Sequence, residues 1–536
     1  MAITRKEFLK LGLVAGGAGL ALSSGASASP LGGMGNATRG NLLRSAARLP
    51  KPFGVSLPVP AVLEPVRSDT QADHYEITQK VGKAEILPGL QTEVWGYEGS
   101  FPGPTIESRS GRATIVRQVN ELPVPVSTHL HGGRTPASSD GFPTDLILPR
   151  HRSSDEHSPH AHHGNPDRPL DNMAGWSFHR GSKDYFYPLE QRAATLWYHD
   201  HRMGFSGPQV YKGLAGFHIV RDDEEDGLPL PKDEKDVPLM ICDRSFGEHG
   251  SFIYPARDPS LQSKRGVKEN YMGGVLGDAI LVNGVPWPFM EVSNTRYRFR
   301  ILNASNARRY GLALEPNPSE GAPFVQVGSD RGLLGAPIPH RTIPIAPAER
   351  FDVLIDFSRY PLGTKVTLKN RLGDGTTSRV MRFHVVRKEK EESTVPKRLS
   401  DMSAFEALGE SGPRLTRKFT FSQAAPNGHV VWAINGKVFD PSRIDARPKL
   451  GSTEIWEFYT DAHHPVHLHL VHFKVLSRNG RRPLPKDAGW KDTVDVLPGQ
   501  VVRVISRFDG YRGKYVFHCH NLEHEDMMMM ANFGVI

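Results

Sequence analysis

The chain has 536 residues, which is too long for one hydrophobic core and corresponds to roughly three or four domains of ~150 residues each. Aromatic residues make up 9% of the chain, and 53 glycines and 43 prolines fit a turn-rich β protein better than a helical one. The net charge is +8, but the sequence has no block of Lys and Arg and no aromatic-basic RNA motif. These features favour an all-β protein, argue against nucleic-acid binding, and mildly favour acidic substrates.

Residues 1–28 have the features of an export signal. Arg5 and Lys6 precede a weakly apolar run over residues 11–22, and the sequence Ala-Ser-Ala at 26–28 suits signal peptidase. The run is too short to cross a membrane, so we expect no membrane span in the mature chain. The segment resembles a twin-arginine (Tat) signal with Lys6 in place of the second arginine, which leaves Sec export or a retained anchor open. We therefore expect an exported protein, periplasmic or extracellular.

The first globular segment, residues 50–222, contains two histidine pairs. His129 and His131 end a strand-like run and are followed by two glycines, and His199 and His201 form the second pair. Residues two apart on a β-strand share a face, so each pair presents both imidazoles to one side. Two such pairs without a cysteine predict half of a shared polynuclear metal site.

A histidine-rich stretch over residues 151–163 separates the two pairs. Such stretches can bind metal, and copper loading is one interpretation. The interpretation we prefer is a solvated insertion.

The second segment, residues 236–386, repeats the strand pattern without the metal pattern. Strand-like runs at 279–283, 297–303 and 351–357 are separated by Gly and Pro turns. Its histidines are isolated, among them His340 and His384, and no two are spaced as in the first segment. We therefore predict a spacer that separates and supports two metal-bearing domains, followed by a linker over residues 387–413.

The third segment, residues 414–536, carries the other histidines. His467 and His469 share a strand face, whereas His464 lies an odd number of residues away and tends to the opposite face. In the same way His518 and His520 face one side and Cys519 the other. Alternation therefore groups His464 with Cys519, and the remaining four histidines with each other. His463 is the alternative to His464, but the proline that follows His464 favours the latter.

The sequence has only two cysteines, Cys242 and Cys519. A disulfide is the usual interpretation for an exported protein. However, Cys519 lies between two histidines and is better explained as a thiolate ligand, whereas Cys242 follows an apolar run and is expected to be a buried, inert thiol. A thiolate, an imidazole five residues later and a thioether make the trigonal His/Cys site with a long axial Met that is typical of blue copper.

Together, the four motifs H-x-H-G, H-x-H, H-x-x-H-x-H and H-C-H-x-x-x-H-x-x-x-x-M resemble the copper-ligand signature of three-domain multicopper oxidases. The flanking sequence is most similar to the bacterial spore-coat laccase and bilirubin oxidase branch, in residues 129–136, 197–201, 280–284, 298–306 and 518–526. The resemblance implies three cupredoxin-like Greek-key β-sandwich domains, with a trinuclear copper centre between the first and the third.

The resemblance also implies four copper ions and a role for each ligand. The type 1 copper would take His464, Cys519, His524 and, as axial ligand, Met529, although Met527, Met528 and Met530 leave a one-residue ambiguity. The type 2 copper would take His129 and His467, and the type 3 pair would take His131, His199, His201, His469, His518 and His520. Asp140 and Glu525 match acids that the family places near the trinuclear centre, where they would relay protons. Plain surface carboxylates are the alternative for both.

The function implied is that of a copper-dependent oxidase of the laccase or bilirubin oxidase type. It would couple one-electron oxidation of a small donor, near His464, to the four-electron reduction of dioxygen to water, with the segment His518-Cys519-His520 connecting the sites. We expect a monomer whose partners are dioxygen and a small donor. Phenols, aromatic amines, bilirubin and low-valent metal ions remain open as donors. The alternatives are a cuprous or manganese metallo-oxidase, for which a longer Met-rich insert is expected, and a non-enzymatic cupredoxin protein, against which the intact ligand set argues.

Overall fold

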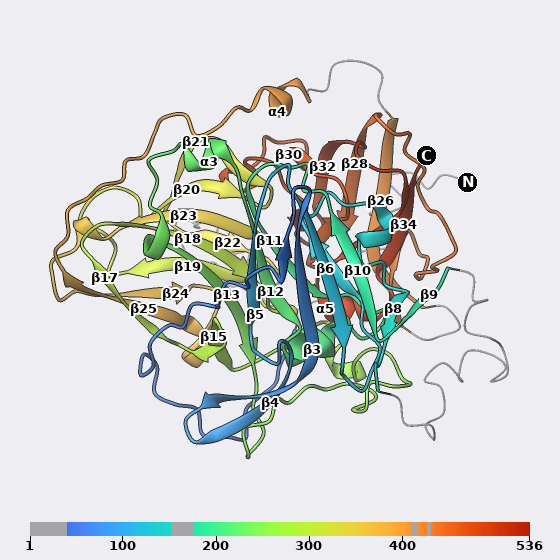
Figure 1. Ribbon diagram of the computed structural model, residues 1–536, viewed down its shortest axis with the longest axis horizontal. Helices are drawn as coiled ribbons and strands as arrows, with labels where there is room; N and C mark the ends of the chain where they lie inside the picture. The colour runs from blue at the N-terminus through green and yellow to red at the C-terminus, as the bar shows by residue number, and fades with distance from the viewer. Residues whose placement is uncertain (1–39, 152–174, 409–414, 426–429) are drawn as a thin grey trace, which may run out of the picture. The chain divides into compact units, whose positions relative to one another are not determined.

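The computed structural model describes residues 40–151, 175–408, 415–425 and 430–536. The predicted export signal and most of the histidine-rich stretch, residues 152–163, lie outside these ranges. Strands are the predominant secondary structure of the described chain, and helices are short (Figure 1), so the prediction of an all-β protein is confirmed. Within the described ranges, no helix has both the length and the apolar character needed to cross a membrane.

Most strands between residues 67 and 221 form two sheets that share one core. The first has the order β10 (Ser182–Tyr187), β6 (Ala113–Asn120), β3 (Ala72–Leu87) and β2 (Arg67–Ser68), with β4 (Leu90–Tyr97) also paired to β3. The second has the order β5 (Gly103–Arg109), β12 (Ala215–Arg221), β11 (Ala194–Asp200) and β7 (Thr128–His131). Ile77 and Val116 from the first sheet share a core with Leu130 and Leu196 from the second, as expected for stacked sheets.

The strands between residues 236 and 387 form a second pair of sheets. One has the order β16 (Val285–Pro286), β15 (Ala279–Val282), β13 (Asp236–Arg244), β18 (Arg296–Asn303), β23 (Arg350–Asp356), β20 (Phe324–Ser329) and β21 (Gly332–His340). The other has the order β17 (Phe289–Ser293), β25 (Arg379–Arg387), β24 (Lys365–Asn370), β19 (Tyr310–Glu315) and β22 (Ile343–Ile345). The predicted strands at 279–283, 297–303 and 351–357 correspond to β15, β18 and β23.

The strands between residues 415 and 535 form the third pair. One sheet has the order β27 (Val431–Ile434), β26 (Leu415–Ala424), β28 (Thr453–Thr460), β32 (Val501–Arg507) and β30 (Phe473–Arg478). The other has the order β31 (Thr493–Val496), β29 (His464–Leu468), β33 (Gly513–Cys519) and β34 (Met530–Val535). Phe419 and Val504 from one sheet meet Val494 and Phe517 from the other in a common core, which also contains Cys519.

The remaining elements are short. Two small sheets pair β1 (Asn41–Leu42) with β14 (Val275–Leu276), and β8 (Asp145–Leu148) with β9 (Ser177–Arg180). The α-helices are α2 (Ser206–Lys212), α3 (Asp223–Asp226), α4 (Ser403–Ala407) and α5 (Leu522–Asp526), and 3-10 turns include η1 (Ala137–Ser139). Helices α2 and α5 pack against each other and bring residues 206–212 beside the C-terminal histidine motif.

The predicted linker after β25 is partly packed against the second pair of sheets. Leu399 is buried with Leu333 and Leu334 of β21, and α4 lies within the linker. The charged composition of the linker concealed this contact, which is made by two apolar side chains, Leu399 and the partly buried Val395. The bounds assigned to three domains from the sequence, 50–222, 236–386 and 414–536, stay predictions.

Candidate metal centre

The two histidine pairs of the first segment lie on neighbouring strands. His129 and His131 belong to β7, His199 belongs to β11, and His201 follows one residue after that strand ends. In the antiparallel register, His129 lies opposite His199. Each pair therefore projects toward the same side of the sheet, and all four imidazoles are buried.

In the third segment, β29 and β33 play the same role. His467 lies opposite His518, and Val466 lies opposite Cys519. Because side chains alternate along a strand, the imidazole of His518 and the thiol of Cys519 point to opposite faces of β33. His518 accordingly contacts His201 and His469, whereas Cys519 contacts His464.

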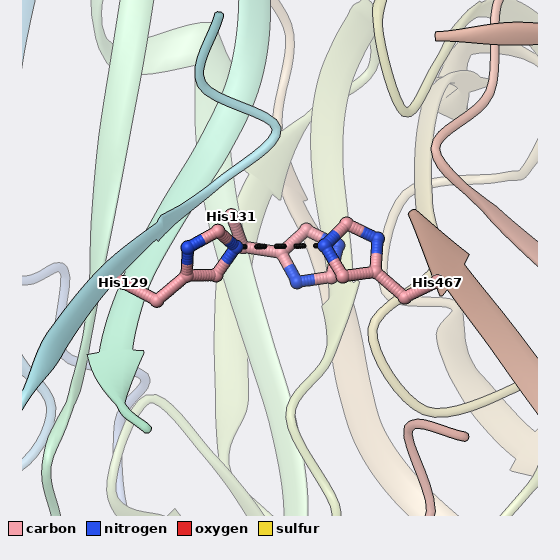
Figure 2. Close-up of side chains that lie close together, drawn as sticks. All are labelled: His129, His131 and His467. Carbon is pink, nitrogen blue, oxygen red and sulfur yellow. Dashed lines mark hydrogen bonds between the residues drawn. The ribbon is translucent and has the colours of Figure 1, made fainter. Parts of the chain in front are cut away.

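Eight histidines, four from each segment, meet in what we call the histidine cluster. Six of the eight histidines form two triads, and within each triad one nitrogen atom of every ring lies within 4.8 Å of the other two. One triad consists of His131, His199 and His520, and the other of His201, His469 and His518. His129 and His467 face each other with their Nε2 atoms 3.5 Å apart. Figure 2 shows these two rings pointing toward each other from opposite sides, with His131 beside them.

Several nitrogen atoms of the first triad have no hydrogen-bond partner, which indicates whether the triad could hold a metal ion. His131 Nδ1, His199 Nε2 and both ring nitrogens of His520 are buried without a hydrogen-bond partner. Burial lowers the pKa of His131 to about 3 and that of His199 well below its usual value, so these rings are neutral. Neutral imidazoles that converge in the protein interior are suited to a bound transition-metal ion, which would take one nitrogen lone pair from each ring.

Two carboxylates orient the cluster from outside. The Nδ1 atom of His469 lies 2.7 Å from Asp140 Oδ2, and that of His129 lies 2.5 Å from the main-chain oxygen of Asp140. Glu525 lies 3.2 Å from His518 Nδ1 and accepts a hydrogen bond from Ser206. A histidine whose Nδ1–H is held by an oxygen presents Nε2 to a metal, so both acids are placed as orienting groups.

The pKa values of the two acids move in opposite directions. Burial raises the pKa of Asp140 well above its usual range. Burial also raises that of Glu525, but the neighbouring His201 and His518 outweigh this effect and bring its pKa to about 2. Neither acid lies on the surface, since both side chains are about 1% exposed.

The second cluster, which we call the mixed cluster, consists of His464, Cys519 and His524. The sulfur of Cys519 lies 3.3 Å from His464 Nδ1 and 3.6 Å from His524 Nδ1. All three are buried, and burial raises the pKa of the thiol well above its usual value. A thiol that is costly to ionise alone becomes a thiolate when a cation shares its site, so one soft sulfur and two imidazole donors suit copper.

The four C-terminal methionines divide between two cores. Met527 and Met529 share the core of Cys519, whereas Met528 and Met530 lie in or against a separate cluster around Phe142. Among the four, Met529 alone is bonded through its backbone to both ligand segments, since its oxygen accepts from Cys519 N (3.2 Å) and its N–H donates to His524 O (3.0 Å).

Other residues considered from the sequence lie outside both clusters. His463 contacts Arg309, and His340 contacts Gln326. Cys242 is a free, buried thiol whose pKa is raised to about 11 by burial. The sequence reasoning missed Asp492, whose carboxylate lies 3.1 Å from His131 Nε2, because it stands more than twenty residues from any histidine motif and resembles an ordinary strand-edge acid.

Comparison with known proteins supports the composition of these clusters. Residues 78–155 and 178–225 match one sequence signature described as multicopper oxidase, and residues 411–536 match another with the same description. The chain is 36% identical to a laccase of Bacillus subtilis (strain 168), with 90% of this chain and 98% of that protein aligned. It is 34% identical to bilirubin oxidase of Albifimbria verrucaria over 90% of this chain and 81% of that protein.

Solved structures give the same picture. The laccase of Pediococcus acidilactici is similar with a TM-score of 0.76 at 31% identity, covering 92% of this chain and 96% of that one. A multicopper oxidase of Campylobacter jejuni, described as a metallo-oxidase, has a TM-score of 0.72 at 25% identity over 92% of this chain and 99% of that one. The expected fold of cupredoxin domains is thus confirmed. Identity of 36% across most of the chain, with buried His and Cys clusters of the composition that copper requires, shows that the chain belongs to the multicopper oxidase family and is a laccase-like oxidoreductase that reduces dioxygen.

Proposed function

We propose that this protein oxidises organic one-electron donors, namely phenols, aromatic amines and bilirubin-like tetrapyrroles, and reduces dioxygen to water with four copper ions. In this proposal the mixed cluster holds type 1 copper, with Met529 as the axial ligand. His129 and His467 hold type 2 copper, and the two histidine triads hold the type 3 pair. When bound, copper supplies the one-electron steps and the reduction of dioxygen.

The observation that carries the proposal is the direct covalent connection between the two clusters. Cys519 of the mixed cluster is bonded in sequence to His518 and His520, which belong to different triads of the histidine cluster. The mixed cluster lies in the core of one pair of sheets and the histidine cluster lies between two segments. One strand end therefore joins a site suited to a single metal ion to a site whose histidines could hold several.

Asp140 and Glu525 have a second task in this proposal. Dioxygen reduction consumes protons, and both acids contact histidines of the cluster while remaining buried. Asp140, whose pKa is raised, can hold a proton and donate it, whereas Glu525, whose pKa is lowered to about 2, is ionised and would accept a proton and pass it on. Ser206, which donates to Glu525, extends this contact toward α2.

The arrangement of the methionines favours organic donors over metal ions. Sequence positions 404–526 contain no methionine, and Met527, Met529 and Met530 are buried in protein cores. The thioethers that would capture a soft cuprous ion at the surface near His464 are therefore absent from this part of the sequence. One observation favours the alternative, a metallo-oxidase: Asp461, which is substantially exposed, lies 3.5 Å from His464 Nε2 and would attract a cation.

A panel of donors tests the proposal. We expect substituted phenols and synthetic laccase dyes to give the highest kcat/KM, with measurable oxidation of bilirubin and slower oxidation of Cu(I) and Mn(II). Asp461→Asn sharpens the comparison, because it removes one negative charge next to His464 and should leave neutral phenols unaffected. Rapid Cu(I) oxidation that depends on Asp461, together with negligible phenol turnover, would replace the proposed donor class by metal ions.

A further inference from the structure

One arginine of the second pair of sheets reaches the histidine cluster. Arg350 begins β23 and is 1% exposed. All five N–H donors of its guanidinium group form hydrogen bonds. Three go to main-chain oxygens, from Nε to Thr195 (3.0 Å), from Nη1 to Ala348 (2.9 Å) and from Nη2 to Asp330 (2.8 Å). The other two go to the carboxylate of Asp492, from Nη1 to Oδ1 (2.8 Å) and from Nη2 to Oδ2 (2.5 Å). Because the guanidinium group is planar and rigid, these two parallel hydrogen bonds fix both the position and the orientation of the Asp492 carboxylate.

Asp492 in turn contacts both halves of the histidine cluster. Its Oδ1 atom lies 3.1 Å from His131 Nε2, and its main-chain oxygen lies 2.9 Å from His467 Nδ1. The neighbouring hydroxyl of Thr493 lies 3.2 Å from His131 Nε2, 3.3 Å from His467 Nδ1 and 2.9 Å from Asp492 Oδ1. One short segment therefore orients a histidine proposed for the type 3 pair and one proposed for type 2 copper.

The contact determines which nitrogen of His131 is free. A carboxylate beside Nε2 holds the proton there, so Nδ1 keeps its lone pair. That Nδ1 atom is buried without a partner, and His131 is a member of the triad with His199 and His520. Rotation of the ring would turn the protonated nitrogen toward the triad and remove one of its three donors.

The segment that carries Asp492 is itself held by buried charges. Asp330 lies 3.3 Å from the main-chain nitrogens of Asp492 and Thr493 and accepts from the main-chain nitrogen of Arg350 (2.8 Å). Lys491 Nζ lies 3.0 Å from Asp330 Oδ2 and 3.3 Å from Glu349 Oε1. These charged groups are buried in alternating sign, an arrangement that is costly to disturb by removing one member.

We propose that Arg350 and Asp492 form a positioning unit for the copper-binding histidines. The second pair of sheets, which contributes no His or Cys to either cluster in the described residues, thereby sets the geometry of a copper site built by its neighbours. This inference rests on the copper assignments proposed above. It also gives the predicted supporting role of the second segment a specific form.

Two conservative variants test the proposal by spectroscopy. Arg350→Lys keeps the positive charge but cannot make the two-pronged contact, and Asp492→Asn keeps the size but weakens the acceptor beside His131. We expect each variant to keep the blue absorption of the mixed cluster. The histidine cluster should bind copper about 10- to 100-fold more weakly, with a weaker near-ultraviolet band of the type 3 pair, to which His131 is assigned, and an altered type 2 electron paramagnetic resonance signal.

The matched control is Arg298→Lys. Arg298, on β18, is also a buried arginine. It forms an ion pair with Asp352, which lies on β23 like Arg350, and another with Glu225 outside the second pair of sheets. It contacts neither cluster. We expect the control to keep all copper signals. Variants at 350 and 492 that match the control in copper content and spectra would overturn the proposal, as would failure of both to fold while the control folds. If the unmodified protein binds fewer than four coppers, the copper assignment fails instead.

Discussion

The mixed cluster and the histidine cluster are built on different principles. The mixed cluster lies within one largely apolar core, where the Trp432 ring packs 3.9 Å from the His524 ring and the polar contacts are made by Asn521 and Asp461. The histidine cluster takes four rings from residues 129–201 and four from residues 467–520, and it is surrounded by Asp140, Asp492 and Glu525. The mixed cluster is a local site in a largely apolar core and suits a single ion, whereas the histidine cluster depends on the docking of two segments and on surrounding carboxylates to orient its donors.

The largest expected effect is a change that abolishes one cluster and leaves the other intact. Cys519→Ser removes the thiolate, so the blue absorption should vanish and donor oxidation should fall below detection. The histidine cluster should keep its copper, because none of its donors is changed. Visible spectra, metal analysis and circular dichroism on one preparation check this, and a variant that stays blue would refute the role of Cys519. A buried hydroxyl costs about 1–3 kcal/mol, which the fold should tolerate.

A change on the polar shell should act on dioxygen reduction alone. Asp140→Asn keeps an oxygen beside His469 but removes the acid, so kcat should fall by about 100-fold with every organic donor, while the blue absorption is unchanged. Steady-state rates with three chemically different donors provide the measurement. If the rate falls with only one donor, Asp140 acts on that donor and has no part in proton transfer.

A substitution of the glycine after His131 tests whether the close packing around the Arg350–Asp492 ion pair is needed for copper binding. Gly132 has φ = +88°, and a Cβ atom there would lie 2.8 Å from Arg350 Nη2 and 3.1 Å from Asp492 Oδ2. Gly132→Ala should therefore destabilise the fold by about 1–3 kcal/mol and reduce type 2 copper, without loss of the blue absorption. Gly111→Ala, at φ = +76° with no neighbour within 4 Å, is the control for backbone strain alone. Equal copper content in the two variants would contradict the role of the close packing.

The smallest expected effect lies at the axial position. Met529→Leu should keep the colour and raise the reduction potential of the mixed cluster by on the order of 60 mV, about a tenfold change in a one-electron equilibrium, because loss of a weak donor favours Cu(I). Met528→Leu, in the other core, should leave the potential unchanged. A redox titration of both variants decides the register, and the opposite pattern would move the axial ligand by one residue.

The sequence predicted the local features of the site well. Alternation along β29 and β33 separates Cys519 from His518 without knowledge of any partner, because a strand has only two faces. The division of the eight histidines between triads could not be derived in this way. The family resemblance assigned two histidines to type 2 copper and six to the type 3 pair, but the division of those six into triads depends on how β7 and β11 meet β29 and β33, and it comes from the structure.

The residues that orient the histidines could not be predicted from the sequence for the same reason. Arg350 and Asp492 are 142 residues apart, and neither stands in a histidine motif. The only local signal was Gly132, whose absent side chain leaves room for their ion pair, and a glycine after a strand usually indicates just a turn. The packed linker was missed because one buried leucine, Leu399, is invisible in a charged composition.

The most direct test of the account is a copper count on the purified, fully loaded protein, combined with its electron paramagnetic resonance spectrum. We predict four coppers per chain, a blue type 1 signal from the mixed cluster, a type 2 signal from the site of His129 and His467, and a spin-coupled pair that is silent. One copper or none, with every ligand residue intact, would contradict the assignment of two clusters to a single oxidase.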